Sequence, residues 1–132
     1  MRYLAVDPGG RRMGLAVGDS ETGLVSPLAV VPYRGAAEAA AHVAGEARRL
    51  GAVEVVVGLP TLADGRRGGG SARSEKLARE LESRGLRVHL QAEHLTTDEA
   101  RRRARAAGRA RGAPVDDLAA LVILEEFLAG GS

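Results

Sequence analysis

The 132-residue sequence contains no cysteine and no tryptophan, and aromatic residues make up only 2% of it. Without cysteine, the chain has no disulfide bond, no thiolate metal site and no cysteine nucleophile. So few aromatic side chains argue against a platform on which the bases of single-stranded nucleic acid stack. The core must therefore be built mainly from alanine, valine and leucine, within an apolar content of 45%.

Two longer sequence features are also missing. The chain shows no amino-terminal basic-then-apolar signal segment and no run of about 18 apolar residues that could cross a membrane. We therefore expect a cytoplasmic protein that does not act at a membrane. The length suits one domain over residues 1–132, because there is neither an internal repeat nor a long linker.

Positive charge is concentrated in one part of the chain. The net charge is only +2, but Lys76 is the only lysine, so arginine carries nearly all the positive charge. The planar guanidinium group suits phosphate, which points to a nucleic-acid backbone as a partner. The alternative is a solvated helix face in a chain that prefers arginine to lysine. The clustered arginines, in a segment without acidic residues, are Arg101, Arg102, Arg103, Arg105, Arg109 and Arg111.

The apolar pattern predicts a mixed α/β domain. Three strands are followed by alternating helices and strands and then by two helices, an order typical of one mixed sheet with helices on its faces. Pro27 predicts that the third strand starts irregularly or lies at an edge. The glycine-rich stretch 61–71 predicts a mobile loop. The expected strands span 2–7, 13–18, 23–32, 53–58 and 86–93, and the expected helices span 35–51 and 72–84, with two more opening at Thr96 and Pro114.

Three acidic residues stand at the ends of these elements: Asp7 after the first strand, Glu93 at the end of the last strand and Asp116 at the head of the last helix. Each has an ordinary explanation, as a turn residue, a solvated strand end or an acid that favours the helix dipole. Burying unpaired carboxylates is costly, so the three together favour a converging cluster that binds divalent cations. Oxygen ligands suit Mg²⁺ or Mn²⁺, and two such ions can activate water and stabilise the leaving oxygen in phosphodiester cleavage.

Other kinds of catalytic site find little support in the sequence. The three histidines lack the spacing of zinc ligands. We expect packed or surface roles for His42 and His89, whereas His94 is a candidate for contact with substrate. The stretch 65–71 lacks the Gly-Lys-Ser/Thr ending of a nucleotide-binding P-loop.

Four segments resemble the YqgF family, also called RuvX-like, described as Holliday-junction resolvases and as nucleases for the 5′ end of pre-16S ribosomal RNA. They occur in the family's order and cover the chain almost from end to end. The resemblance implies an RNase H-like fold: a mixed five-stranded sheet, with its first three strands antiparallel, flanked by helices. The segments are DPGGRRMGLAVGD (7–19), VVVGLPTLADG (55–65), EHLTTDEA (93–100) and VDDLAALVIL (115–124).

By position, the family's acidic residues fall on Asp7, Glu93 and Asp116, the same three that the residue pattern indicates. The chain departs from the family in two places. It has Ala92, Glu93 and His94 where the family usually has Asp-Glu-Arg, and residues 61–63 replace the commoner Leu-Asn-Met.

The loss of the acid at position 92 puts metal binding in doubt only if that position is the ligand. Alternation along the strand places Ala92 with Val88 and Leu90 on a packed face and Glu93 on the other face. This pattern favours Glu93 as the metal ligand.

The residues and the resemblance together predict a metal-dependent nuclease for structured nucleic acid, most specifically the 5′ end of pre-16S rRNA. The alternatives are a Holliday-junction resolvase and a non-catalytic RNA-binding assembly factor. The second alternative is suggested by Ala92, which stands where the family usually has an acidic residue. A sugar-kinase-like or actin-like ATPase normally needs a second, similar half that 132 residues cannot hold. We expect a monomer or homodimer in which Asp7, Glu93 and Asp116 hold Mg²⁺ or Mn²⁺ and are the catalytic residues. The predicted phosphate-binding residues are Arg11, Arg12, Arg66, Arg67, Arg73, Arg101, Arg102 and Arg105.

Overall fold

The computed structural model describes residues 1–60, 70–93 and 96–130, apart from the side chains of residues 96 and 97. The order of elements is the predicted one. His94 lies outside the described residues, and so does the predicted loop 61–71 except for its last two residues. The elements are β1 (Arg2–Pro8), β2 (Arg12–Asp19), β3 (Val25–Pro32), α1 (Gly35–Leu50), β4 (Glu54–Pro60), α2 (Ser71–Ser83), β5 (Arg87–Glu93), α3 (Thr96–Ala106) and α4 (Asp116–Leu128).

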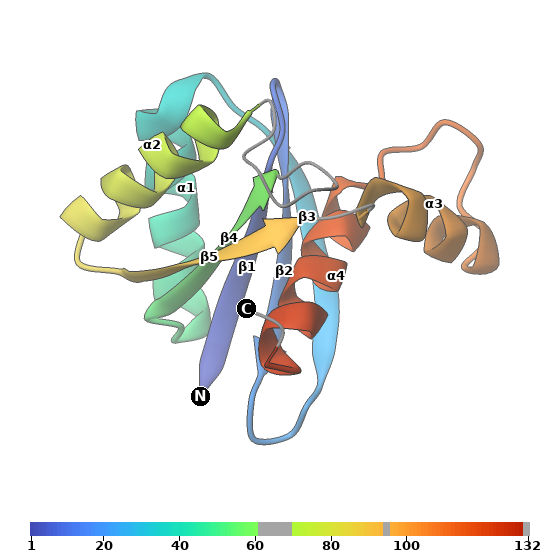
Figure 1. Ribbon diagram of the computed structural model, residues 1–132, viewed down its shortest axis with the longest axis horizontal. Coiled ribbons are helices and arrows are strands. Elements are labelled where there is room, and N and C mark those ends of the chain that lie inside the picture. Colours follow the sequence, from blue (N-terminus) through green and yellow to red (C-terminus); the bar gives the residue numbers. More distant parts are fainter. Residues whose placement is uncertain (61–69, 94–95, 131–132) are drawn as a thin grey trace.

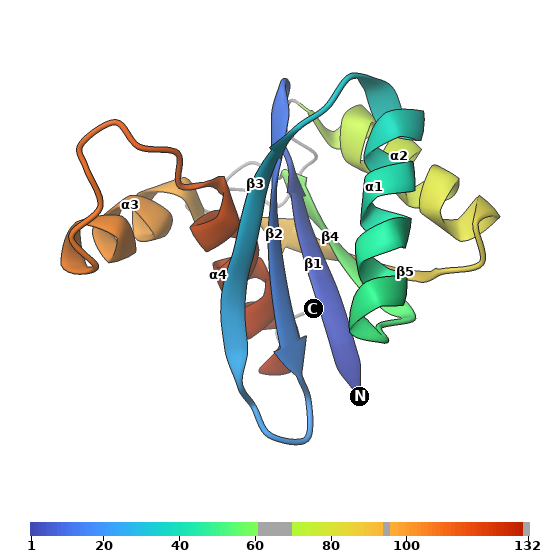
Figure 2. The same cartoon turned by 180° about the vertical axis from the view of Figure 1, so that it is seen from behind.

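The strands form one five-stranded sheet in the order β3-β2-β1-β4-β5. The first three strands pair antiparallel, whereas β4 is parallel to β1 and β5 is parallel to β4. Helices α1 and α2 lie on one face, α4 lies on the other, and α3 projects away from the sheet (Figures 1 and 2). The mixed sheet flanked by helices confirms the predicted fold class.

Each face of the sheet has its own hydrophobic core. Leu4 and Val6 of β1 point toward α1 and α2, whereas Ala5, between them, points toward α4. Val56 of β4 packs on the α4 side, while Val55 and Val57 pack on the opposite side. The central strands are therefore covered on both faces, as the continuous apolar run 53–58 predicts.

The last helix begins at Asp116, two residues later than predicted from Pro114. The carbonyl of Pro114 accepts a hydrogen bond from the Arg109 guanidinium at 3.3 Å, and the first helical bond of α4 runs from Ala119 N–H to the carbonyl of Val115. Once it begins, the helix is buried at every position from Asp117 to Leu124. None of the described helices has the length and hydrophobicity needed to span a bilayer.

The two edge strands differ. β3 contains Pro27, and the register of its pairing with β2 shifts between Leu15 and Ala16, so the predicted irregular edge is confirmed. On the other edge, Val88 of β5 packs against the core under α1 and α2. Leu90 does not: it is 43% exposed, so its predicted place on a packed face is wrong. An edge strand has a neighbour on one side only, and Leu90, unlike Val88, does not pack against the described core under α1 and α2.

Candidate active site

Asp7 lies near the carboxyl end of the central strand β1, at the edge of the molecule where the chain turns back into β2. The turn is closed by a hydrogen bond from Gly9 N–H to the carbonyl of Arg12 at 3.0 Å, and a Cβ on Gly9 would lie 2.5 Å from that oxygen. The Tyr33 hydroxyl donates to the carbonyl of Gly9. Only glycine fits this close approach, so the Asp-Pro-Gly turn holds Asp7 at a fixed place.

Glycines stand on both sides of Asp7 in the sheet. Gly14 of β2 pairs directly with Asp7, and Gly58 of β4 is the residue after Val57, which pairs with Val6. A glycine inside a strand often marks a close approach of another group. Here both glycines face α4, and each makes room for a different acidic residue.

Gly58 makes room for Glu93, the last residue of β5. A Cβ at Gly58 would lie 2.9 Å from Glu93 Oε2 and 2.6 Å from Cδ1 of Ile123. The carboxyl group of Glu93 therefore reaches across β4 and forms a hydrogen bond with the Asp7 carboxyl group. Residues 7 and 93, far apart in the sequence, are thus brought into contact.

Gly14 makes room for the start of α4. A Cβ at Gly14 would lie 1.8 Å from the carbonyl oxygen of Asp116, so only glycine allows the helix to begin this close to β2. Asp116 is near enough to Asp7 for its charge to act on the Asp7 carboxyl group. Its own carboxylate accepts a hydrogen bond from Arg12 Nε.

The environment raises the pKa of both Asp7 and Glu93. Burial, the charge of Glu93, a hydrogen bond with Glu93 and the charge of Asp116 together raise the pKa of Asp7 to about 8, against the lowering effect of Arg73. Burial also raises the pKa of Glu93. The Asp7–Glu93 pair therefore retains a proton at neutral pH.

The three acids are not all in contact with one another. Asp7 and Glu93 are in contact, while the carboxylate of Asp116 is directed to Arg12. Within the described part of the chain, no three acidic or histidine side chains form a group already closed around a metal-sized space. The arrangement is thus a partly buried pair of carboxyl groups with a third carboxylate beside it.

Asp117, next to Asp116, has a structural contact instead. It is 8% exposed, and both of its carboxylate oxygens accept hydrogen bonds from Arg109 at 2.9 Å. Burial alone would raise the pKa of Asp117, but the hydrogen bonds from Arg109 outweigh it and lower the pKa. This pair ties the segment before α4 to the helix.

The predicted phosphate-binding arginines lie on two sides of the acids. Arg73, in the first turn of α2, acts on the charge of Asp7, and Arg11 lies in the β1–β2 turn beside Tyr33. Arg102 is paired with Glu99, and Arg66 and Arg67 lie outside the described residues. A groove of about 740 Å³ between α3 and the start of α4 is lined by Arg12, Arg101, Arg105, Arg109 and Arg111 among others.

Of the packed or surface role expected for His89, the structure shows the packed one. His89 packs against Tyr3 and Phe127 and lies 3.3 Å from Glu54 Oε1. Sequence reasoning missed the two glycines, Gly14 and Gly58, that bring the acids together. The signal that could have found them is a glycine within an otherwise apolar strand.

Comparison with known proteins identifies the family. Residues 1–130 match the family RuvX, described as Holliday junction resolvase. The chain belongs to this family. A relative from Anaeromyxobacter sp. (strain Fw109-5), named "Putative pre-16S rRNA nuclease", is 38% identical over 98% of each chain. A relative of the same name from Azotobacter vinelandii is 38% identical over 96% of this chain and 92% of its own. At the level of the RuvX family, the prediction of a nuclease, a hydrolase of phosphodiester bonds, is confirmed.

Solved structures support the fold. RuvC of T. thermophilus, in complex with a Holliday junction substrate, superposes with a TM-score of 0.59 at 17% identity, covering 100% of this chain and 97% of that one. A ROK hexokinase from Thermus thermophilus superposes with a TM-score of 0.50 at 27% identity, covering 85% of this chain. The superposition covers only 39% of the kinase chain, which agrees with the argument that a kinase of this type needs a second half.

Proposed function

We propose that this RuvX-family protein is a divalent-metal-dependent nuclease that cleaves structured RNA, most specifically at the 5′ end of pre-16S rRNA in the cytoplasm. The observation that carries the proposal is the contact between Asp7 and Glu93, which brings two partly buried carboxyl groups together beside Asp116. Acidic side chains converging at a sheet edge are a recurrent way to assemble a phosphodiester-cleaving site. The names of the relatives support the RNA substrate.

The chemistry of these residues fits Mg²⁺ or Mn²⁺. All candidate donors are carboxylate oxygens, and burial together with their mutual repulsion keeps a proton on the Asp7–Glu93 pair. Asp7, Glu93 and Asp116 would hold the metal, which supplies Lewis-acid stabilisation of the phosphate and an activated water. Holding a metal would require the Asp7–Glu93 pair to lose its proton.

Arg12 and Arg73 are placed to bind the phosphates on either side of the acids. Arg12 contacts Asp116 and also lines the arginine groove, so a phosphate arriving there competes with Asp116 for the same guanidinium group. Arg73 approaches from α2, and its charge opposes the rise in the pKa of Asp7. The two arginines thus orient the strand across the carboxyl groups.

The test is a nuclease assay on a pre-16S rRNA fragment, with Mg²⁺, Mn²⁺ or EDTA. Asp7→Asn, Glu93→Gln and Asp116→Asn should each reduce the cleavage rate at least about a hundredfold, because each removes a charge that the reaction needs. Asp98→Asn is the matched control, since Asp98 is an exposed acid of α3. Cleavage at the unchanged rate by Asp7→Asn protein, or in EDTA, would rule out this mechanism.

A second candidate is cleavage of four-way DNA junctions. It is supported by the description of the RuvX family and by the similarity of fold to RuvC. Two symmetric cuts need two copies of the site, so this function requires a homodimer. The same assay with a four-way junction, together with light scattering of the complex, separates it from RNA processing. Binding of RNA without turnover under any of these conditions would instead favour a non-catalytic assembly factor.

A further inference from the structure

A small pocket lies on the opposite side of the β1–β2 turn from Asp116. It has a volume of about 310 Å³, within the range typical of small-ligand sites. We call it the Tyr33 pocket. Among the described residues, its lining includes Tyr33 and Ala36, together with Arg73 and Lys76 of α2.

The lining combines apolar walls with two cations. Ala36, Ala39 and Leu77 supply aliphatic surface from α1 and α2, and Tyr33, itself only 9% exposed, supplies the one aromatic ring. Arg73 and Lys76 lie one turn apart on α2 at the same pocket. Within the described part of the chain, Lys76 forms no ion pair, so its charge is available to a ligand.

The pocket adjoins the acidic site. Pro8 and Gly10 of its lining flank the turn that follows Asp7, and a Cβ on Gly10 would lie 3.8 Å from the Arg73 guanidinium. Arg73 acts on the charges of both Asp7 and Tyr33. A ligand in the pocket would therefore be the immediate neighbour of a phosphate held at the acids.

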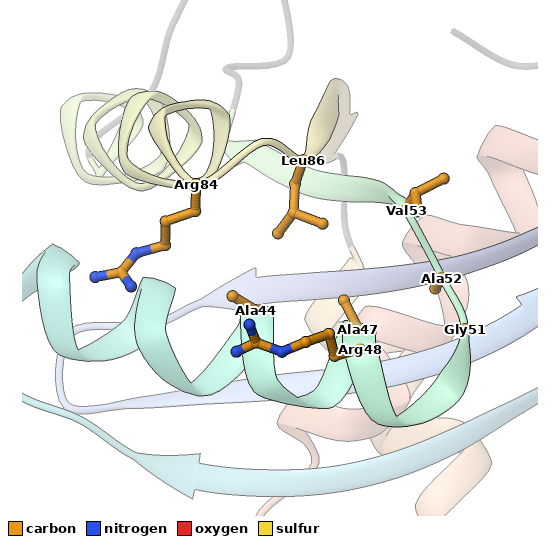
Figure 3. Close-up of a pocket in the computed structure, with 8 residues that line it drawn as sticks. All are labelled: Ala44, Ala47, Arg48, Gly51, Ala52, Val53, Arg84 and Leu86. Carbon is orange, nitrogen blue, oxygen red and sulfur yellow. The ribbon is translucent and has the colours of Figure 1, made fainter.

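A second cavity of about 510 Å³ offers a useful contrast (Figure 3). Its lining includes Arg48 beside the small residues Ala44 and Ala47 on α1, and Arg84 from the end of α2 on the other side. However, Arg48 is in the last turn of α1 and Arg84 is the C-cap of α2. Helix carboxyl ends disfavour anions, whereas the Tyr33 pocket is bounded by the first turns of the same two helices.

We propose that the Tyr33 pocket receives one unstacked nucleotide of the substrate strand, with its phosphate bound by Arg73 and Lys76 and its sugar and base against Tyr33 and the alanine walls. This inference rests on the proposed nuclease function and names its substrate class: nucleic acid that is unpaired next to the cleaved bond. A fully paired strand keeps its bases stacked and cannot fill the pocket. The pocket thus selects the site of cleavage by local strand opening.

The first test measures binding without cleavage, in EDTA, by amide NMR shifts. Nucleoside 5′-monophosphates should shift the amides of Gly10, Ala36 and Lys76, and inorganic phosphate or uridine should bind at least about tenfold more weakly. Lys76→Gln should weaken monophosphate binding about tenfold, whereas Arg48→Gln at the cavity of Figure 3 should leave it unchanged. Equal affinity for phosphate and for the monophosphates would overturn the nucleotide assignment.

The second test fills the pocket. Ala36→Leu places a larger side chain in the lining, while Ala37→Leu makes the same change at an exposed neighbour outside it. Ala36→Leu should weaken binding of RNA with an unpaired nucleotide at least about tenfold and leave binding of fully paired RNA unchanged. If Ala36→Leu protein binds and cleaves both RNAs normally, the pocket proposal is wrong and the nuclease proposal is unaffected. If monophosphates bind in the pocket but no substrate is cleaved, the nuclease proposal is wrong and the pocket remains a nucleotide-binding site.

Discussion

Asp7 shows how one carboxyl group can be held in its neutral form by its surroundings alone. It is partly buried between two glycines of the neighbouring strands, contacts Glu93 and lies within reach of the charge of Asp116. An isolated aspartate in water loses its proton near pH 3.8, whereas this one keeps it to about pH 8. The folded chain therefore resists ionisation at the place where the proposed chemistry needs charge.

This shift predicts that Asp7→Asn stabilises the metal-free protein at high pH. Below pH 3.8 the carboxyl group is protonated in both states, and between pH 3.8 and about 8 the unfolded chain ionises while the folded chain does not. The wild-type protein thus loses stability across this window. In denaturant titrations with EDTA, the free energy of unfolding of Asp7→Asn should exceed that of wild type by about 2–5 kcal/mol at pH 8. Near pH 4 the two free energies should be equal.

Asp19→Asn is the control, because its effect on stability should depend on pH in the opposite direction. Hydrogen bonds from the backbone N–H of Glu21 and Thr22 lower the pKa of Asp19, so its stabilising effect is present at neutral pH and lost as the pH falls. A stability gain in Asp7→Asn that does not change with pH would contradict the assigned pKa.

Gly58→Ala should damage the acidic pair directly. The new methyl group would meet Ile123 Cδ1 at 2.6 Å and Glu93 Oε2 at 2.9 Å, so one of them must move. We expect a loss of about 1–3 kcal/mol in the free energy of unfolding and a weaker response to Mn²⁺ in calorimetry. Gly45→Ala, in the interior of α1 with nothing within 4 Å of the added Cβ, should instead be stabilising. Wild-type Mn²⁺ binding in Gly58→Ala would contradict the expected damage to the acidic pair and would mean that Ile123 moves in place of Glu93.

At the scale of elements, the docking of α4 on the sheet decides where the third acid lies. The start of α4 approaches β2 at Gly14, and the segment before it is tied down by the pair of Arg109 and Asp117. Asp116 depends on both contacts for its position. Neither contact is made by a hydrophobic residue, although α4 is the most apolar helix of the chain.

The Arg109–Asp117 pair should contribute measurably to stability. It is bidentate and largely buried at Asp117, so removing either partner leaves a buried group without its hydrogen bonds. In a double-mutant cycle with Arg109→Gln and Asp117→Asn, we expect a coupling of about 1–3 kcal/mol from chemical denaturation at pH 7. Arg111→Gln, an exposed arginine of the same segment, should change stability by less than about 0.5 kcal/mol. A coupling near zero would show that the helix start is held by other contacts.

Element order was predictable because apolar spacing carries it, and the acids were predictable because Asp7, Glu93 and Asp116 stand at element ends. The relation between the acids was not predictable. It depends on Gly14 and Gly58, whose lack of a side chain leaves room for Asp116 and Glu93, and on the ion pair of Arg12 with Asp116. The prediction for Leu90 is wrong for a similar reason. Alternation assigns a side chain to one face of the sheet, but it does not show how far the helices cover that face. The start of α4 shifts because Arg109 takes the carbonyl of Pro114.

At the scale of the whole molecule, charge is distributed around the sheet edge that carries the acids. Arg73 and Lys76 lie on the α2 side, and the arginine groove lies on the side of α3 and α4. The net charge of +2 therefore understates the positive field that a nucleic-acid strand would meet.

Nucleic-acid binding should accordingly be strongly dependent on salt. In fluorescence anisotropy with an RNA hairpin at several KCl concentrations, Arg101→Gln and Arg105→Gln should each reduce the slope of log K against log[salt] by about 0.7–0.9. Arg49→Gln is the control, because Arg49 is paired with Glu46 in the last turn of α1. Unchanged slopes in both groove variants would show that the strand runs elsewhere.

The parallel pairing of β1, β4 and β5 has a consequence for synthesis of the protein. Its candidate carboxylates come from positions 7, 93 and 116 of 132, so nearly the full polypeptide must leave the ribosome before they can assemble. The proposed site would therefore be complete only once α4 has docked on the sheet, and a chain that stops before α4 would lack its third carboxylate.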